Sequence, residues 1–262
     1  MDSEIALALE RLGESTDRLL ATADRLTDAQ AAGGSRLPGW TRGHVLTHIA
    51  RNADGFRNLL AWARTGIETP MYPSEESRAR SVEAGAGRSA AELAADLRAS
   101  AGAFAAAAGD LPAAAWDAPV ARRADTFPAR GILTRRRSEL EIHHVDLDAG
   151  YQPDDWPADF VQVALARVAR DFAGRADAPR LLACPEGQEA AFPIGPATPG
   201  PATPGPASTA PASTAPASTG PGSTVTVSGP PAALLAWLTG RDTGAGLEVA
   251  GADTVPVLPP WR

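Results

Sequence analysis

The sequence predicts an α+β protein in which an N-terminal four-helix bundle precedes a small α/β domain. In the first 150 residues, apolar side chains recur at helical spacing through four long stretches. Beyond residue 150, short apolar runs bounded by glycine and proline indicate strands between shorter helices. We therefore expect a helical domain at 1–150 and an α/β domain at 151–262.

Four long helices are expected in the first domain. They are predicted at 3–26, 42–66, 90–109 and 129–149. Thr41 is a good N-cap for the second helix, and Ser89 with Glu92 forms a capping box that opens the third. The stretch at 69–74 is expected to be a long, semi-rigid loop. Helices of this length with short connections favour an antiparallel bundle, a fold that builds metal sites from facing helices.

The second domain is predicted to mix strands and helices. Its helices are expected at 159–173 and 232–239, and its strands at 180–184, 190–194, 224–228 and 247–249. Between two of these strands, residues 195–223 repeat five-residue units of proline, alanine, serine, threonine and glycine. This tract contains no large apolar side chain and cannot form a core. We expect it to be a disordered, solvated excursion.

Composition narrows the classes of function. The chain has 24 basic and 31 acidic residues, for a net charge of -7, and contains no lysine. This charge disfavours nucleic acid as a partner. The N-terminus has no secretory pattern and no stretch is apolar enough to cross a membrane, so a cytoplasmic protein is expected. The single cysteine, Cys184, excludes an intrachain disulfide and fits a reducing compartment.

All four histidines of the chain lie in two helical segments. His44 and His48 are four residues apart on the second helix, which places both imidazoles on one face. Glu139 and His143 have the same spacing on the fourth helix. Two helices that each direct an imidazole inward, one of them adding a carboxylate, can enclose three sides of a divalent metal ion.

Either pair alone is more often an ordinary contact on a helix surface than a metal site. The concentration of every histidine in these two segments favours the metal interpretation. Imidazole and carboxylate without thiolate suit zinc or another first-row divalent ion. Three protein ligands would leave one coordination position open, as catalytic sites do. Asp146 either orients a ligand imidazole or makes a plain surface contact, and the sequence leaves both interpretations open. The basic run at 135–137 is expected to be a solvated helix face rather than a device that steers anions.

Three segments resemble one known family. They are LPGWTRGHVLTHIARNA at 37–53, ETPMY at 68–72 and RSELEIHHVDL at 137–147. They resemble the mycothiol-dependent maleylpyruvate isomerases, whose N-terminal bundle is similar to the DinB-like metalloproteins. The resemblance implies that His48, Glu139 and His143 bind zinc, with His44 and His144 as neighbours. It also implies an active-site role for Arg241, which follows the last helix of the second domain.

The family's reaction converts maleylpyruvate to fumarylpyruvate, a cis-to-trans isomerisation. It requires a nucleophile that adds to the conjugated double bond, permits rotation and then leaves. Cys184 lies in an apolar, strand-like run and is interpreted as a buried structural thiol. The resemblance therefore implies two cofactors, zinc and the external thiol mycothiol, with Arg241 binding a carboxylate of the anionic substrate.

Two alternatives remain open from the sequence. A mycothiol-dependent S-transferase would use the same site but consume the thiol rather than return it. A regulatory module would bind a metal without catalysis, in which case no coordination position would be accessible to a thiol. In every case we expect a monomer that binds neither nucleic acid nor membranes.

Overall fold

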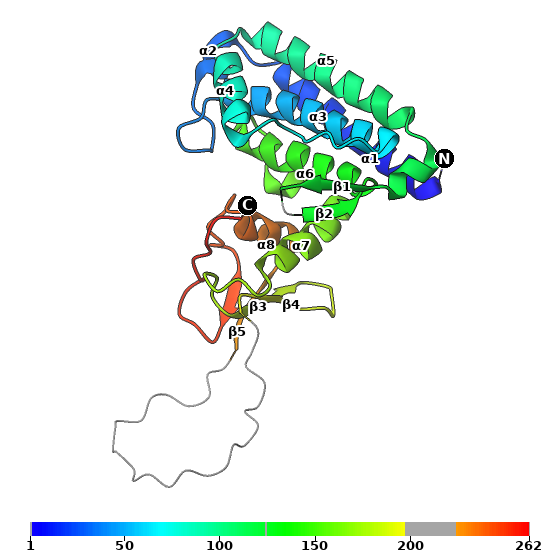
Figure 1. Ribbon diagram of the computed structural model, residues 1–262. Helices are drawn as coiled ribbons and strands as arrows, with labels where there is room; N and C mark the ends of the chain where they lie inside the picture. The colour runs from blue at the N-terminus through cyan, green and yellow to red at the C-terminus, as the bar shows by residue number, and fades with distance from the viewer. Residues whose placement is uncertain (1, 124, 197–223, 262) are drawn as a thin grey trace, which may run out of the picture. The chain divides into compact units, whose positions relative to one another are not determined.

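The computed structural model describes residues 2–123, 125–196 and 224–261 (Figure 1). The chain divides into two compact units, Met1–Asp155 and Trp156–Arg262. Helices dominate the first unit and a four-stranded sheet lies in the second, which confirms the α+β class. We predicted a repeat tract at 195–223. Residues 197–223 of this tract lie outside the described residues.

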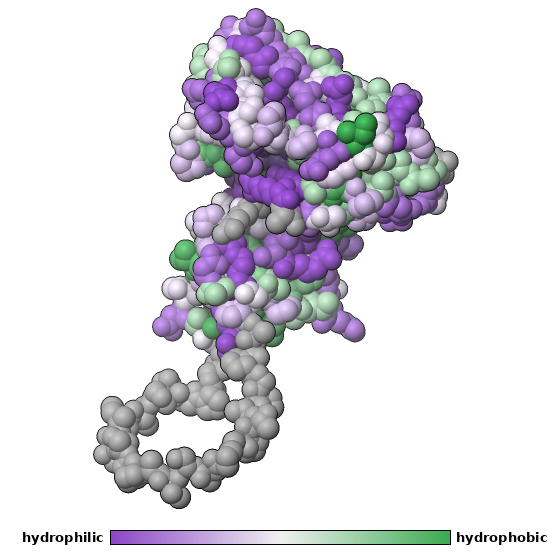
Figure 2. Space-filling model, in the orientation of Figure 1, coloured by the Kyte–Doolittle hydropathy of each residue, from purple (hydrophilic) through white to green (hydrophobic). Residues whose placement is uncertain are grey.

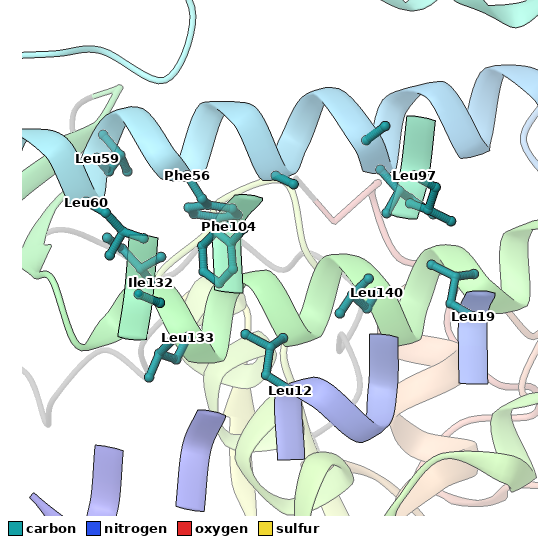
Figure 3. Close-up of a cluster of buried hydrophobic side chains, with 14 of the residues drawn as sticks. Leu12, Leu19, Phe56, Leu59, Leu60, Leu97, Phe104, Ile132, Leu133 and Leu140 are labelled. Carbon is teal, nitrogen blue, oxygen red and sulfur yellow. The ribbon is translucent and has the colours of Figure 1, made fainter. Parts of the chain in front are cut away.

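Four long helices enclose the core of the first unit. They are α1 (Ser3–Ala23), α3 (Arg42–Thr65), α5 (Ala90–Gly109) and α6 (Gly131–Asp146). Both α1 and α3 contact α5 and α6. Figure 3 shows leucines and phenylalanines of these helices pointing toward one another. Burial of this apolar surface is the main force that holds the four helices together.

The predicted capping residues are confirmed. The side chain of Thr41 accepts a hydrogen bond from the backbone nitrogen of His44, and Ser89 does the same for Glu92. The first helix ends three residues earlier than expected, at Ala23. A separate short helix, α2 (Asp28–Ala32), follows with its own capping box at Thr27.

A further helix, α4 (Glu75–Ala86), lies where we predicted no regular element from the sequence. It packs very closely on α3, and two glycines make this possible. A Cβ atom at Gly43 would lie 2.1 Å from the carbonyl oxygen of Ala86, and one at Gly85 would lie 2.5 Å from Cγ2 of Thr47. Only glycine permits this approach, which brings α4 beside the start of α3.

Between α5 and α6, the chain forms a small hairpin that the sequence analysis did not anticipate. After a short 3₁₀ turn at Ala113–Asp117, strand β1 (Pro119–Arg122) pairs antiparallel with β2 (Asp125–Pro128). Strand β1 contacts α3, and β2 contacts α6 (Figure 1). The hairpin therefore lies against the two helices that carry the histidines.

The described residues of the second unit form two helices and one sheet. Its elements are α7 (Ala158–Phe172), β3 (Leu181–Pro185), β4 (Phe192–Ile194), β5 (Val225–Gly229), α8 (Pro231–Leu238) and β6 (Glu248–Ala250). The strand order is β4-β3-β5-β6, with β3 and β5 parallel and the outer pairs antiparallel. Each predicted helix and strand of this part is present within a few residues.

The described part of the chain has no helix that is both long enough and apolar enough to span a bilayer. Hydrophilic residues are distributed widely over the visible face of the first unit, with hydrophobic residues between them (Figure 2). This distribution is normal for a protein that keeps its apolar side chains in a core.

Candidate metal centre

Three side chains, His48 on α3 and Glu139 and His143 on α6, converge at one point. The Nε2 atom of His48 lies 3.2 Å from Oε2 of Glu139 and 3.1 Å from Nε2 of His143. Nε2 of His143 lies 3.4 Å from the same Glu139 oxygen. Within the described ranges, this is the one group of three or more potential ligand side chains that meets in this way.

The triangle of ligand atoms has the dimensions of one face of a tetrahedral metal site. Zinc with bonds of about 2.0–2.1 Å holds neighbouring ligand atoms about 3.3–3.4 Å apart. Two imidazole nitrogens and a carboxylate oxygen are all acceptors unless protonated, so their close approach requires protons or a cation among them. The residues therefore fit a divalent ion, and they leave its fourth corner to an external ligand.

Asp146 fixes the orientation of the His143 imidazole. Its Oδ2 atom lies 2.7 Å from Nδ1 of His143, and the aspartate is only 1% exposed. A carboxylate in this position holds the imidazole proton on Nδ1 and directs the lone pair of Nε2 into the triangle. Of the two interpretations that the sequence left open for Asp146, the structure supports the orienting contact.

His48 has a different partner at its second nitrogen. Its Nδ1 atom lies 3.2 Å from Nη2 of Arg78 on α4. A guanidinium can only donate, so His48 accepts at Nδ1 and carries its own proton on Nε2. Metal coordination at Nε2 requires the other tautomer, and binding must therefore loosen the contact with Arg78. Arg78 is absent from the predicted site because α4 was not expected, although Ser74 as N-cap and Glu75 in the first turn signalled a helix.

His48, Glu139 and His143 shift one another's pKa values. Burial lowers the pKa of His48 to about 4, against the opposing hydrogen bond with Glu139. Burial also disfavours the charged form of Glu139, but hydrogen bonds with His143 and His48 hold its pKa well below the usual value. Burial disfavours the imidazolium of His143 too, yet hydrogen bonds with Asp146 and Glu139 raise its pKa. Near neutral pH without metal, Glu139 is an anion and His48 is neutral.

The hairpin and the 69–74 segment supply further polar groups beside the triad. Nη2 of Arg122, on β1, lies 3.5 Å from Oε1 of Glu139. The hydroxyl of Tyr72 is buried and has no hydrogen-bond partner among the residues that the structure describes. Burial and the charge of Glu139 raise the pKa of Tyr72. Its ring lies against α3 at Gly55, where a Cβ atom would be 3.2 Å from the tyrosine Cζ.

The other two histidines are neighbours and not members of the triangle, as the resemblance implied. His44 caps α3 through Nδ1, and its Nε2 lies 3.1 Å from Oε2 of Glu83. His144 faces α1, where its Nε2 lies 2.8 Å from the hydroxyl of Thr22. The His144 ring also stacks on Tyr151, with centroids 3.9 Å apart.

The expectation that the basic run at 135–137 is a solvated face is wrong. Arg136 is 2% exposed and Arg137 is 9% exposed. Arg135 forms an ion pair of 2.6 Å with Asp125 and lies over the ring of Phe127. The run turns inward because partners distant in sequence accept its hydrogen bonds, and charge alone does not reveal such partners.

Two residues singled out from the sequence belong to the second unit. Arg241 follows α8, and its Nη1 atom donates to the carbonyl oxygen of Thr239 at 2.6 Å. Its role in binding a substrate stays a prediction. Cys184 lies half-buried in β3.

Comparison with known proteins decides the family. The family described as "mycothiol maleylpyruvate isomerase N-terminal domain" matches residues 12–148. The C-terminal domain of the same family matches residues 155–258. The chain therefore belongs to the mycothiol maleylpyruvate isomerase family. The resemblance stated from the sequence is confirmed at this level. A search of curated proteins found no match.

Solved structures agree with this family assignment. The crystal structure of the mycothiol-dependent maleylpyruvate isomerase matches with a TM-score of 0.81 and 26% sequence identity, over 98% of this chain and 97% of that chain. A histidine-to-alanine mutant of that enzyme matches with a TM-score of 0.80 and the same identity and coverage. The similarity extends over both family domains of the chain.

Proposed function

We propose that this family member is a zinc-containing, mycothiol-dependent maleylpyruvate isomerase. The observation that carries the proposal is the triangle of His48, Glu139 and His143, whose three sides of 3.1–3.4 Å match one face of a tetrahedral ion. Family membership and the likeness to the solved isomerase support the same reaction.

In this proposal, His48, Glu139 and His143 hold the ion, and Asp146 keeps Nε2 of His143 available as a ligand. When bound, a divalent ion stabilises the thiolate of an external thiol at neutral pH, and that thiol is the nucleophile the isomerisation needs. The side chains of this chain supply the charge complementarity. Arg122 lies beside Glu139, and we propose that Arg241 binds a substrate carboxylate through its planar guanidinium.

An absorbance assay of maleylpyruvate isomerisation, run with and without mycothiol, tests the proposal. We expect turnover only when the thiol is present, and the thiol should be recovered unchanged. His48→Ala should abolish turnover, whereas the matched control His44→Ala should retain it, because His44 lies outside the triangle. Thiol-independent turnover, or full activity of His48→Ala, would contradict the proposed mechanism. Stoichiometric loss of mycothiol would instead identify an S-transferase.

The role of Arg241 needs its own variant. Arg241→Lys keeps the positive charge but cannot form the two parallel hydrogen bonds that a guanidinium makes with a carboxylate. We expect a higher KM for maleylpyruvate with metal content unchanged. An unaltered KM would show that Arg241 does not bind the substrate. The proposal for the metal triad would be unchanged by that result.

A further inference from the structure

A groove lies between α1 and α5, outside the candidate metal centre. It has a volume of about 270 Å³. Leu9, Leu12 and Leu20 of α1 line it on one side, and Phe104 of α5 lines it on the other. Leu12 and Phe104 belong to the buried core, so the groove reaches from the surface to the centre of the first unit. We call this cavity the α1–α5 groove.

Two glycines keep the α1–α5 groove open. Gly13 in the middle of α1 and Gly102 in the middle of α5 both line it. A Cβ atom built at either position meets no other atom within 4 Å. Neither glycine is therefore required by close packing, although each weakens its helix relative to alanine. Each helix therefore has a glycine, which is a poor helix former, at a position where a larger side chain would fill the groove.

The core side of the groove is formed by a buried cation. Arg136, on α6, lines the groove and is 2% exposed. Its Nη1 atom donates to the carbonyl oxygen of Ile49 at 2.9 Å and to Oδ1 of Asn52 at 2.7 Å. Its Nη2 atom has no hydrogen-bond partner among the described residues, and the charges of Glu139 and Asp54 act on the guanidinium without a direct hydrogen bond to it. Burial lowers the pKa of Arg136 to about 10, so it remains charged at neutral pH.

A fully buried guanidinium without a carboxylate in direct contact is costly, and an anion that reaches its free Nη2 atom offsets part of that cost. We propose that the α1–α5 groove binds a small carboxylate with an apolar body, such as a medium-chain fatty acid, with its carboxylate paired to Arg136. The planar fork of the guanidinium matches a carboxylate, while the leucines and Phe104 match a hydrocarbon chain. The cavity is smaller than a typical drug-sized pocket, which limits the ligand to a short chain. This site is distinct from the metal triad and does not depend on the proposed isomerase activity.

Calorimetric titration of the intact protein with octanoate tests this proposal, and octylammonium is the matched probe of opposite charge. We expect saturable binding of one octanoate per chain and no saturable binding of octylammonium. Gly102→Leu should weaken octanoate binding at least tenfold, because it adds a bulky side chain at a position that lines the groove and where a Cβ atom meets no neighbour. The control Ala106→Leu adds the same side chain to an exposed position of α5 outside the groove and should leave binding unchanged.

Two further variants separate the groove from other sources of binding. His48→Ala should bind octanoate as the wild type does, because the metal triad is not involved. Arg136→Met should lose octanoate binding while circular dichroism confirms that the helices remain folded. If Arg136→Met does not fold, Gly102→Leu and Gly13→Leu decide the question. Octanoate binding that is unaffected by both glycine variants, or lost in His48→Ala, would overturn the proposal. If octylammonium binds as tightly as octanoate, the positive charge of Arg136 does not select the ligand.

Discussion

Helix α6 carries two carboxylate–histidine pairs that face different neighbours and have opposite characters. Glu139 and His143 face α3, where they meet the imidazole Nε2 of His48 at 3.1–3.2 Å. Glu141 and His144 face α1, where hydroxyl and guanidinium groups provide donors. The same residue types, one or two positions apart on one helix, therefore build an open site on one side and a closed contact on the other.

The closed side is saturated with hydrogen bonds. Glu141 is 1% exposed and accepts from Ser15 at 2.5 Å, from Arg18 at 2.7 Å and from the hydroxyl of Tyr151 at 2.5 Å. Every oxygen of this carboxylate has a donor, so it needs no further ligand. On the open side, acceptors outnumber donors, and a cation is the simplest way to balance them. The balance of donors and acceptors, rather than residue type, distinguishes a metal site from a structural contact.

Replacement of Glu139 by glutamine is the most severe test of this comparison. The variant loses one of the three proposed ligands and the only anionic one, so metal affinity should fall by more than about 100-fold. Competition with a chromophoric chelator measures this affinity directly. Retention of wild-type affinity would mean that the triad is not the metal site.

The matched change on the closed side is Glu141→Gln. Because it replaces a buried charge that pairs with Arg18, we expect the free energy of unfolding to fall by about 3 kcal/mol. Metal stoichiometry should stay at the wild-type value. Chemical denaturation and metal analysis of the same preparation give both numbers. Loss of metal without loss of stability would reverse the roles assigned to the two carboxylates.

The open side should also show a pH dependence that the closed side lacks. The pKa of His143 is raised by Asp146 and Glu139, so at lower pH a proton occupies the nitrogen that would bind metal. Raising the pH removes this proton, and metal affinity should increase by about tenfold per pH unit until His143 is neutral. Calorimetry in buffers of different ionisation enthalpy counts the protons released. A pH-independent affinity would contradict the assignment of His143 as a ligand.

The smallest predicted effect concerns Arg78. Its guanidinium donates to Nδ1 of His48 and disfavours the tautomer that binds metal. Arg78→Gln replaces it with a side chain that can accept from Nδ1, so metal affinity should rise by roughly three- to tenfold. Arg80→Gln, an exposed arginine on the same helix, is the control and should change nothing. Weaker metal binding in Arg78→Gln would show that the contact supports coordination.

Local sequence patterns predicted the helices that carry the triad. The caps at Thr41 and Ser89, and the spacing of Glu139 and His143, depend on neighbours within one helical turn. The hairpin with Arg122 escaped prediction because each of its strands has only four residues. Helix α4 escaped because it buries just two of its side chains, Val82 and Ala86, and so shows little apolar periodicity.

Spacing alone does not reveal which face of a helix meets which neighbour. Glu141 and His144, three residues apart, can share a helix face as Glu139 and His143 do. The i, i+4 spacing and the resemblance to a known family both selected Glu139 as the candidate ligand. The structure gives the physical reason, because Ser15, Arg18 and Tyr151 already satisfy Glu141. The burial of Arg136 is unpredictable for the same reason, since its acceptors lie on α3, more than 80 residues away.

X-ray absorption at the zinc edge tests the central claim most directly. For the zinc-loaded protein, we predict nitrogen and oxygen ligands at about 2.0–2.1 Å that include two imidazoles, and one sulfur at about 2.3 Å after mycothiol is added. Glu139→Gln should not hold the ion under the same conditions, whereas Glu141→Gln should give the wild-type spectrum. A spectrum without a sulfur ligand in the presence of mycothiol would contradict the account.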